Sequence, residues 1–145
     1  MDYTKDPSDG VTQVALVELI NADGSSTVEA KLRYHSGDPY AVTIIFLVGL
    51  KEVSWTFGRD LLLDGLRGPA GHGDVRLRPL LDSHGHAVVM IELHSPDGAA
   101  LVQAPARDLH RFVGRMTTLV GLGSEAKHLD LDAEVAAILG AHATE

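Results

Sequence analysis

The chain contains no cysteine. Disulfide bonds, thiol nucleophiles and cysteine-ligated zinc are therefore excluded, and the absence fits a cytosolic protein. Long hydrophobic runs are missing too, since no segment reaches the roughly 18 to 20 apolar residues that a membrane-spanning helix needs. The opening residues MDYTKDPSDG lack the apolar stretch of a signal peptide. We therefore expect residues 1–10 to form a polar, mobile tail.

Positive charge and aromatic residues are both scarce. Lysine and arginine number 12 against 20 aspartates and glutamates, which gives a net charge of -8, and there are one Trp, three Tyr and three Phe. Nucleic-acid affinity comes mainly from basic residues that displace counterions and from aromatic side chains that stack on bases. The composition therefore argues against a general nucleic-acid binder. The length of 145 residues suits one domain, which we place at residues 11–142.

Seven segments have the pattern of β-strands, four before a short helix and three after it. In the stretch STVEAKLRY, apolar and polar residues alternate, which predicts one buried and one wet face. The uniformly apolar run VTIIFLV predicts burial on both faces or in a subunit contact. The expected strands cover residues 11–20, 26–34, 40–49, 53–57, 74–81, 87–95 and 99–105.

Helical spacing is found in three places. RDLLLDGLR (59–67) is a short leucine-rich helix, and Pro105 opens a longer one, ARDLHRFVGRMTTLV, whose apolar residues recur on one face. DAEVAAILGAH (132–142) predicts a last helix with acidic residues at its start. Strands in hairpins with helices set apart along the chain define an α+β fold with largely antiparallel sheets.

The segment GLRGPAGHG (65–73) is rich in glycine and could be a phosphate-binding loop or only a bend. Phosphate loops run from strand to loop to helix, so that the amides of the helix N-terminus face the anion. Here the loop follows a helix and precedes a strand, and the Lys and Ser/Thr of a P-loop are missing. We therefore predict a structural turn, with Gly68 or Gly71 at positive φ, and expect a Gly71 or Gly73 to Val change to lower stability.

Candidates for chemistry are weak. His84 and His86 with His94 form the best metal hypothesis, but HExxH is absent, and turn or surface histidines are the simpler interpretation. There is no GxSxG elbow for a nucleophilic serine. Arg59 and Asp60, where a strand meets a helix, could be catalytic but fit better as an ion pair beside a helix cap. The sequence therefore predicts no enzyme, no cofactor and no metal.

The long helix carries the most distinctive surface. Arg107, Arg111 and Arg115 recur every four residues and line up as one basic stripe, partly neutralised by Asp108. The stripe is either an ordinary solvated face or a docking surface for an acidic partner or a nucleic-acid strand. The scarcity of aromatic residues favours a protein partner.

The motifs DPYAV, W-x-F-x-RDLL-x-x-GL, GDVR and APAR occur in this order along the chain and are specific together. The four stretches that contain or follow them resemble the SsgA-like family of sporulation and cell-division proteins of actinobacteria, particularly its SsgB-type members. The strand VTQVALVELINADGSS departs from that pattern, and Arg78 stands where the family usually has an aromatic residue. The matching stretches are RYHSGDPYAV (33–42), VSWTFGRDLLLDGLRGPAGHGDVRLRP (53–79), SPDGAALVQAPARDLHRFVGRM (95–116) and HLDLDAEVAAIL (128–139).

The resemblance implies a fold, an assembly and a function. The fold would be Whirly-like, with two antiparallel sheets of about four strands and helices, assembled as a trimer; an eighth strand would lie near Gly49 or after Val120. The function would be a non-enzymatic adaptor, cytoplasmic and at the division septum, that works with other SsgA-like proteins and recruits the tubulin-like protein FtsZ. The Whirly-like architecture and the arginine stripe also suggest an alternative, a single-stranded nucleic-acid-binding protein.

Overall fold

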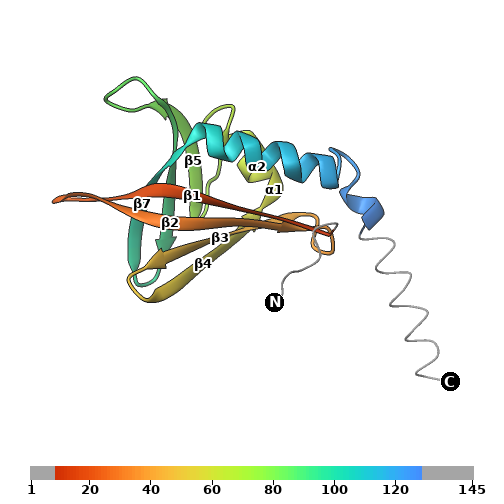
Figure 1. The fold of residues 1–145 in the computed structure, drawn as a ribbon, viewed down its shortest axis with the longest axis horizontal. Coiled ribbons are helices and arrows are strands. Elements are labelled where there is room, and N and C mark those ends of the chain that lie inside the picture. The colour runs from red at the N-terminus through yellow and green to blue at the C-terminus, as the bar shows by residue number, and fades with distance from the viewer. Residues whose placement is uncertain (1–8, 129–145) are drawn as a thin grey trace.

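The computed structural model describes residues 9–128. They form one curled, seven-stranded antiparallel sheet in the order β4-β3-β2-β1-β7-β6-β5, with two helices packed on one core (Figure 1). The strands are β1 (Gly10–Asn21), β2 (Gly24–His35), β3 (Ala41–Val48), β4 (Lys51–Gly58), β5 (Val75–Leu81), β6 (Ala87–Ser95) and β7 (Gly98–Pro105). The helices are α1 (Arg59–Gly65) and α2 (Ala106–Leu119).

The expectation of two four-stranded sheets is wrong, because β1 belongs to both halves of the chain. It pairs along its whole length with β2, and Glu18, Leu19 and Ile20 also pair with β7. These three pairs join the β1–β4 meander to the β5–β7 meander, so the two groups of strands become one continuous sheet.

The seven predicted strands are confirmed, but the eighth is not found in residues 9–128. Gly49, with a φ of 64°, lies in the tight turn between β3 and β4, and residues 121–128 form turns and a short helical segment at 125–128. The prediction that VTIIFLV is buried on both faces is wrong for the single chain. Its residues alternate, with Ile44 buried and Ile45 half-exposed, and Leu47 is 42% exposed.

The core lies between the sheet and the helices. In β1, β2, β3, β5 and β7 the buried residues alternate, whereas β6 buries four residues in a row. The helix α2 and the residue after it add four fully buried side chains, as the helical spacing predicts. Burying each such apolar side chain contributes about 1.5 to 3 kcal/mol relative to exposure. These side chains are Leu109, Phe112 and Met116 of α2 and Val120 directly after it.

Both predicted helices in the described range are confirmed. Pro105 occupies the N-cap position of α2, where its missing N–H costs the helix no hydrogen bond, and α1 follows β4 without a break. Of the predicted tail (residues 1–10), Gly10 already belongs to β1 and residues 1–8 lie outside the described residues, as does the predicted last helix (132–142).

The glycine-rich loop is a structural turn that leads from the C-terminal end of α1 into β5. Within it, Ala70 and Leu77 exchange two backbone hydrogen bonds of 2.8 and 2.9 Å, so the loop pairs with the outer edge of β5. Gly71 has a φ of 97°, as predicted, whereas Gly68 is not in the left-handed region. A Cβ on Gly71 would collide with the carbonyl oxygen of Val75.

The sequence predicts a loss of stability from a side chain at either Gly71 or Gly73, but the structure separates the two positions, because only Gly71 has backbone atoms in the way of a Cβ. We expect Gly71→Ala to lower the free energy of unfolding by about 2 kcal/mol or more, because the new Cβ meets backbone at a strained φ. Gly73→Ala is the matched control, since nothing lies within 4 Å of its Cβ, and its effect should stay within about 0.5 kcal/mol. Chemical denaturation measures both; equal losses would contradict the assignment.

Candidate functional site

The three arginines of α2 are all exposed, but they do not face one hollow. Arg107 borders a hollow of about 560 Å³ between β1, β7 and the β5–β6 turn. Arg111 and Arg115 border an open groove of about 650 Å³ beside the start of β1. The predicted stripe therefore exists as a helix face, divided between two depressions.

The three arginines of the stripe differ in whether their guanidinium groups already have hydrogen-bond or ion-pair partners. Arg115 Nη1 donates a 3.1 Å hydrogen bond to the carbonyl oxygen of Thr12. Arg111 lies 4.0 Å from the carboxylate of Asp108, and its side chain is 63% exposed, so this surface pair contributes little. Arg107 has no ion pair or hydrogen bond with any residue in 9–128.

The bond to Thr12 exists because half of β1 has no strand beside it. The amide of Ser36 donates to Asp9, which continues the β1–β2 ladder and means that odd residues of β1 bond to β2 and even residues face β7. Continuing the β1–β7 register past Glu18 would bring Leu16 opposite Pro105, which has no N–H to donate. The ladder therefore stops there, and β7 turns away into α2.

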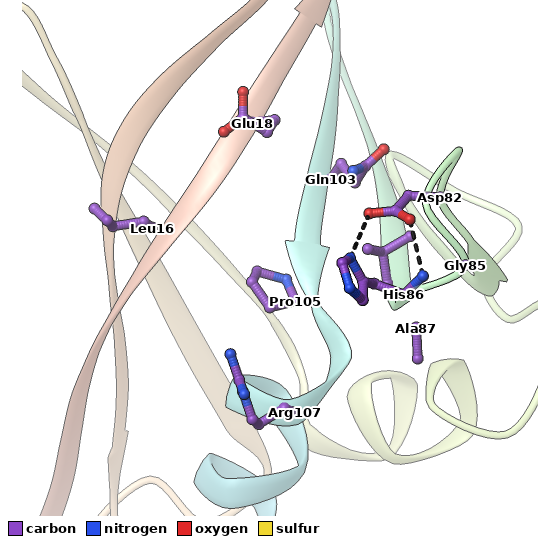
Figure 2. Close-up of a pocket in the computed structure, with 10 residues that line it drawn as sticks. Leu16, Glu18, Asp82, Gly85, His86, Ala87, Gln103, Pro105 and Arg107 are labelled. Atoms are coloured by element: carbon purple, nitrogen blue, oxygen red, sulfur yellow. Dashed lines mark hydrogen bonds and ion pairs between the residues drawn. The ribbon is translucent and has the colours of Figure 1, made fainter.

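The hollow of about 560 Å³ lies where β1 and β7 separate (Figure 2). Leu16 and Glu18 stand on β1, Gln103 and Pro105 on β7, and Arg107 at the start of α2. Leu16 is 61% exposed. The hollow thus combines apolar surface, one arginine and two carboxylates, those of Glu18 and Asp82, a mixture that suits binding to a protein surface.

The turn between β5 and β6 closes the far side of this hollow (Figure 2). Asp82 Oδ1 accepts hydrogen bonds from the backbone amides of His84, at 2.8 Å, and His86, at 2.9 Å. The His86 ring lies 3.6 Å from the same carboxylate. The His86 amide, together with that of His84 and the nearby imidazoles, lowers the pKa of Asp82. Asp82 therefore stays ionised and holds the turn in shape.

The metal hypothesis gains no support from the geometry. His84 and His86 come together, with ring centroids 6.2 Å apart, but His94 lies at the other end of β6 beside Glu92. Within residues 9–128 no three His, Cys, Asp or Glu side chains are arranged to hold a metal ion.

Arg59 and Asp60 do not form the predicted ion pair beside a helix cap. Gly58 occupies the N-cap of α1 without a side-chain bond, and Asp60 is exposed. Arg59 instead is 1% exposed, and its ion pair is with Glu125, far along the chain, at 3.4 Å. This partner could not be predicted from the sequence, because nothing in the residue spacing relates residue 59 to the segment after α2.

The buried guanidinium of Arg59 connects three parts of the fold. Its Nη1 donates to the hydroxyl of Tyr34, at 2.8 Å, and to the carbonyl of Val120, at 2.7 Å. The Tyr34 hydroxyl in turn donates to the carbonyl of Pro39, at 2.9 Å. Nε lies near Glu125 without hydrogen-bond alignment, so that attraction is mainly Coulombic. The cluster therefore fixes β2, the start of α1 and the end of α2 to one another.

These features point to a domain that binds rather than catalyses. The arginines around the hollows are exposed, Glu18 and Asp82 are half-buried, and the pKa of Asp82 is shifted toward the ionised form. In residues 9–128 no helix is long and apolar enough to span a bilayer. The class defined by the fold and the site is an α+β interaction domain built on one curled antiparallel sheet.

Comparison with known proteins identifies the family. The family model described as Streptomyces sporulation and cell division protein, SsgA, matches residues 28–125. The chain is 48% identical over 122 residues to the sporulation-specific cell division protein SsgB of Streptomyces coelicolor, covering 83% of this chain and 88% of SsgB. It is 41% identical to SsgB of Frankia casuarinae, covering 90% and 92%. The chain belongs to the SsgA-like family, whose members are non-enzymatic cell-division proteins.

Solved structures of SsgB and of an SsgA-like protein have the same fold as this chain. A structure from work on mutations in SsgB and longitudinal cell division during sporulation of Streptomyces coelicolor superposes with a TM-score of 0.78 at 45% identity, covering 82% of this chain and 94% of that one. An SsgA-like sporulation-specific cell division protein from Thermobifida fusca gives a TM-score of 0.83 at 36% identity, covering 92% and 98%.

Removing the buried guanidinium should be costly. We expect Arg59→Met to lower the free energy of unfolding by about 3 to 5 kcal/mol, because Glu125 is left as a buried, unpaired charge. Arg59→Met combined with Glu125→Met removes both charges and should recover part of that loss. Urea titrations measure the cycle; strictly additive losses would contradict the pairing.

The same cluster predicts a dependence on alkaline pH. Burial raises the pKa of Tyr34 above its ordinary value of 10.0, against the opposing effect of Arg59. The folded state therefore favours the un-ionised hydroxyl. Its contribution is fully present below pH 10 and is lost as the pH rises through the folded-state value. Above pH 10, we expect wild type to lose stability more steeply than Tyr34→Phe.

Tyr40→Phe is the control for this experiment, since Tyr40 is 46% exposed. Its unfolding curves should follow wild type at every pH between 8 and 11. If Tyr34→Phe and wild type kept a constant difference in stability over that range, Tyr34 would not be responsible.

Proposed function

We propose that this protein is a non-enzymatic adaptor of sporulation-linked cell division, which recruits FtsZ to septum sites in the cytoplasm and promotes its assembly there. The match to SsgB over the described fold carries the proposal. We further propose that it assembles as a trimer and acts with other SsgA-like proteins, as the family resemblance implies.

The α2 arginines are the surface that we assign to an acidic partner. The protein carries a net charge of -8, so an exposed row of arginines is a local exception that can orient an approaching acidic segment. Arg107 is the strongest candidate, because it lines the same hollow as the exposed Leu16 and has no ion pair or hydrogen bond within residues 9–128. Arg115 contributes less, because its guanidinium is bonded to β1.

The single-stranded nucleic-acid alternative has less support. The arginines face two depressions rather than one continuous groove, and among the described residues neither depression is lined by a Phe, Tyr or Trp ring that could stack on a base. The ring that borders the first hollow is the small imidazole of His86. A trimer would also multiply the repulsion from -8 charges per subunit. This alternative would return if labelled single strands bound with micromolar affinity that weakened steeply with salt.

The adaptor role can be tested by co-sedimentation with FtsZ polymers. We expect wild type to pellet with the polymers, and Arg107→Glu/Arg111→Glu to bind about tenfold more weakly, because charge reversal repels an acidic partner. The matched control is Arg33→Glu/Arg67→Glu, which changes the charge equally at exposed arginines of β2 and the loop after α1. It should bind like wild type.

Two outcomes would count against the proposal, at different levels. If wild type neither pelleted with FtsZ nor altered its assembly, alone or with another SsgA-like protein, the adaptor role would fail. If both double variants weakened binding equally, the role would stand and its assignment to α2 would fall.

A further inference from the structure

The sheet has two outer strands, β4 and β5, and only the outer edge of β5 is covered by other residues of the described chain. On β5, the loop residue Ala70 pairs with Leu77 through two hydrogen bonds, and Pro79 has no N–H to offer. These features close β5 against another strand. Within residues 9–128, no strand or loop pairs with the outer edge of β4 (Figure 1).

The hydrogen bonds define which backbone groups of β4 are free. The amide of Arg59 donates to the carbonyl of Tyr40 at 2.7 Å, which continues the β3–β4 register. Odd residues of β4 therefore bond to β3, and even residues point outward. Glu52, Ser54 and Thr56 thus offer their N–H and C=O groups to solvent, without a proline or bulge to protect them.

Apolar side chains accompany this open edge. Val53, Trp55 and Phe57 lie on the core side of β4, opposite Phe46, Ile44 and Val42. Phe57 is buried, but Trp55 is only half-buried, and Val53 is 41% exposed. The core therefore extends to the edge of the sheet and is not fully covered there.

We propose that β4 pairs antiparallel with β4 of a second copy of this chain, about a two-fold axis at Ser54. In this register Ser54 faces Ser54 of the second copy, and Glu52 faces Thr56. Each of these hydrogen-bonded pairs exchanges two backbone bonds, so every outward group of the three residues is satisfied. Val53 then lies opposite Trp55 of the second copy, in the closer, non-hydrogen-bonded kind of pair.

This register favours a second copy over an unrelated partner because the strand is complementary to itself. Glu52 meets Thr56 rather than another carboxylate, and the apolar side chains meet on the core side. A two-fold contact uses the same surface on both copies, so it differs from the contacts that close a three-fold ring. The inference does not depend on the proposed adaptor role and would join rings, or single chains, in pairs.

Cysteine cross-linking tests the register, because the natural chain has no cysteine. Directly opposed residues of a hydrogen-bonded pair have Cα atoms about 5.5 Å apart, which a disulfide can span. We expect Ser54→Cys to form covalent dimers under mild oxidation. Glu52→Cys is the matched control, since two such residues would lie about 13 Å apart along the strands. A mixture of Glu52→Cys and Thr56→Cys should cross-link.

The natural protein offers a second readout, because Trp55 is its single tryptophan. We expect its emission to shift to shorter wavelength as concentration rises. The shift should begin at lower concentration in higher salt, since two copies of charge -8 repel. Ser54→Pro removes the central outward N–H without touching the β3 ladder, and should abolish the shift while the protein stays folded by circular dichroism.

Two results would overturn the proposal. One is cross-linking of Ser54→Cys no faster than that of Glu52→Cys. The other is a Trp55 emission that does not depend on concentration, or that Ser54→Pro leaves unchanged. FtsZ binding by Ser54→Pro would be unaffected in either case, so failure here is distinguishable from failure of the adaptor role.

Discussion

One buried guanidinium ties the first and last parts of the described chain together. Arg59 follows β4 directly, yet its partners are Tyr34 on β2, Val120 at the end of α2 and Glu125 beyond it. A charge buried to this extent is tolerable only when its partners are held in place, and those partners come from three separate elements. The position of α2, and therefore of its exposed arginines, thus depends on a residue that has no part in the exposed surface.

The candidate site follows from where one strand pairing stops. Pro105 cannot donate a hydrogen bond to β1, so β7 leaves the sheet and becomes α2 at the same residue. The separation of the two strands creates the hollow, exposes Leu16 and brings Arg107 to its rim. Arg115 then occupies the carbonyl of Thr12 that a strand would otherwise have used. Pro105 therefore contributes to both features: it ends the β1–β7 pairing beside which the hollow opens, and it begins the helix that carries the basic face.

Local features of this fold could be predicted from the sequence, and long-range ones could not. Alternation and helical spacing located all seven strands and both described helices, because those periods reflect which side chains meet the core. The single sheet was missed because nothing in the periodicity says that Glu18 lies beside Gln103. Arg59 was misread for the same reason, since its adjacent acid, Asp60, was the only partner visible locally. Val14 and Leu16 offered a usable signal for the exposed apolar surface. They are apolar, yet they lie on the face of β1 opposite to Gln13 and Ala15, which form part of the buried face.

Five of the six strand pairings in this sheet join neighbours in the chain, and only β1 with β7 does not. The five close short loops and cost little chain entropy, whereas the three pairs at Glu18 to Ile20 must enclose some eighty residues of intervening chain. Non-local contacts of this kind stabilise the fold only after the chain has lost the entropy of closing that loop, and they therefore slow folding. The short β1–β7 pairing, beside which the hollow opens, is thus the point at which two locally formed meanders become one domain.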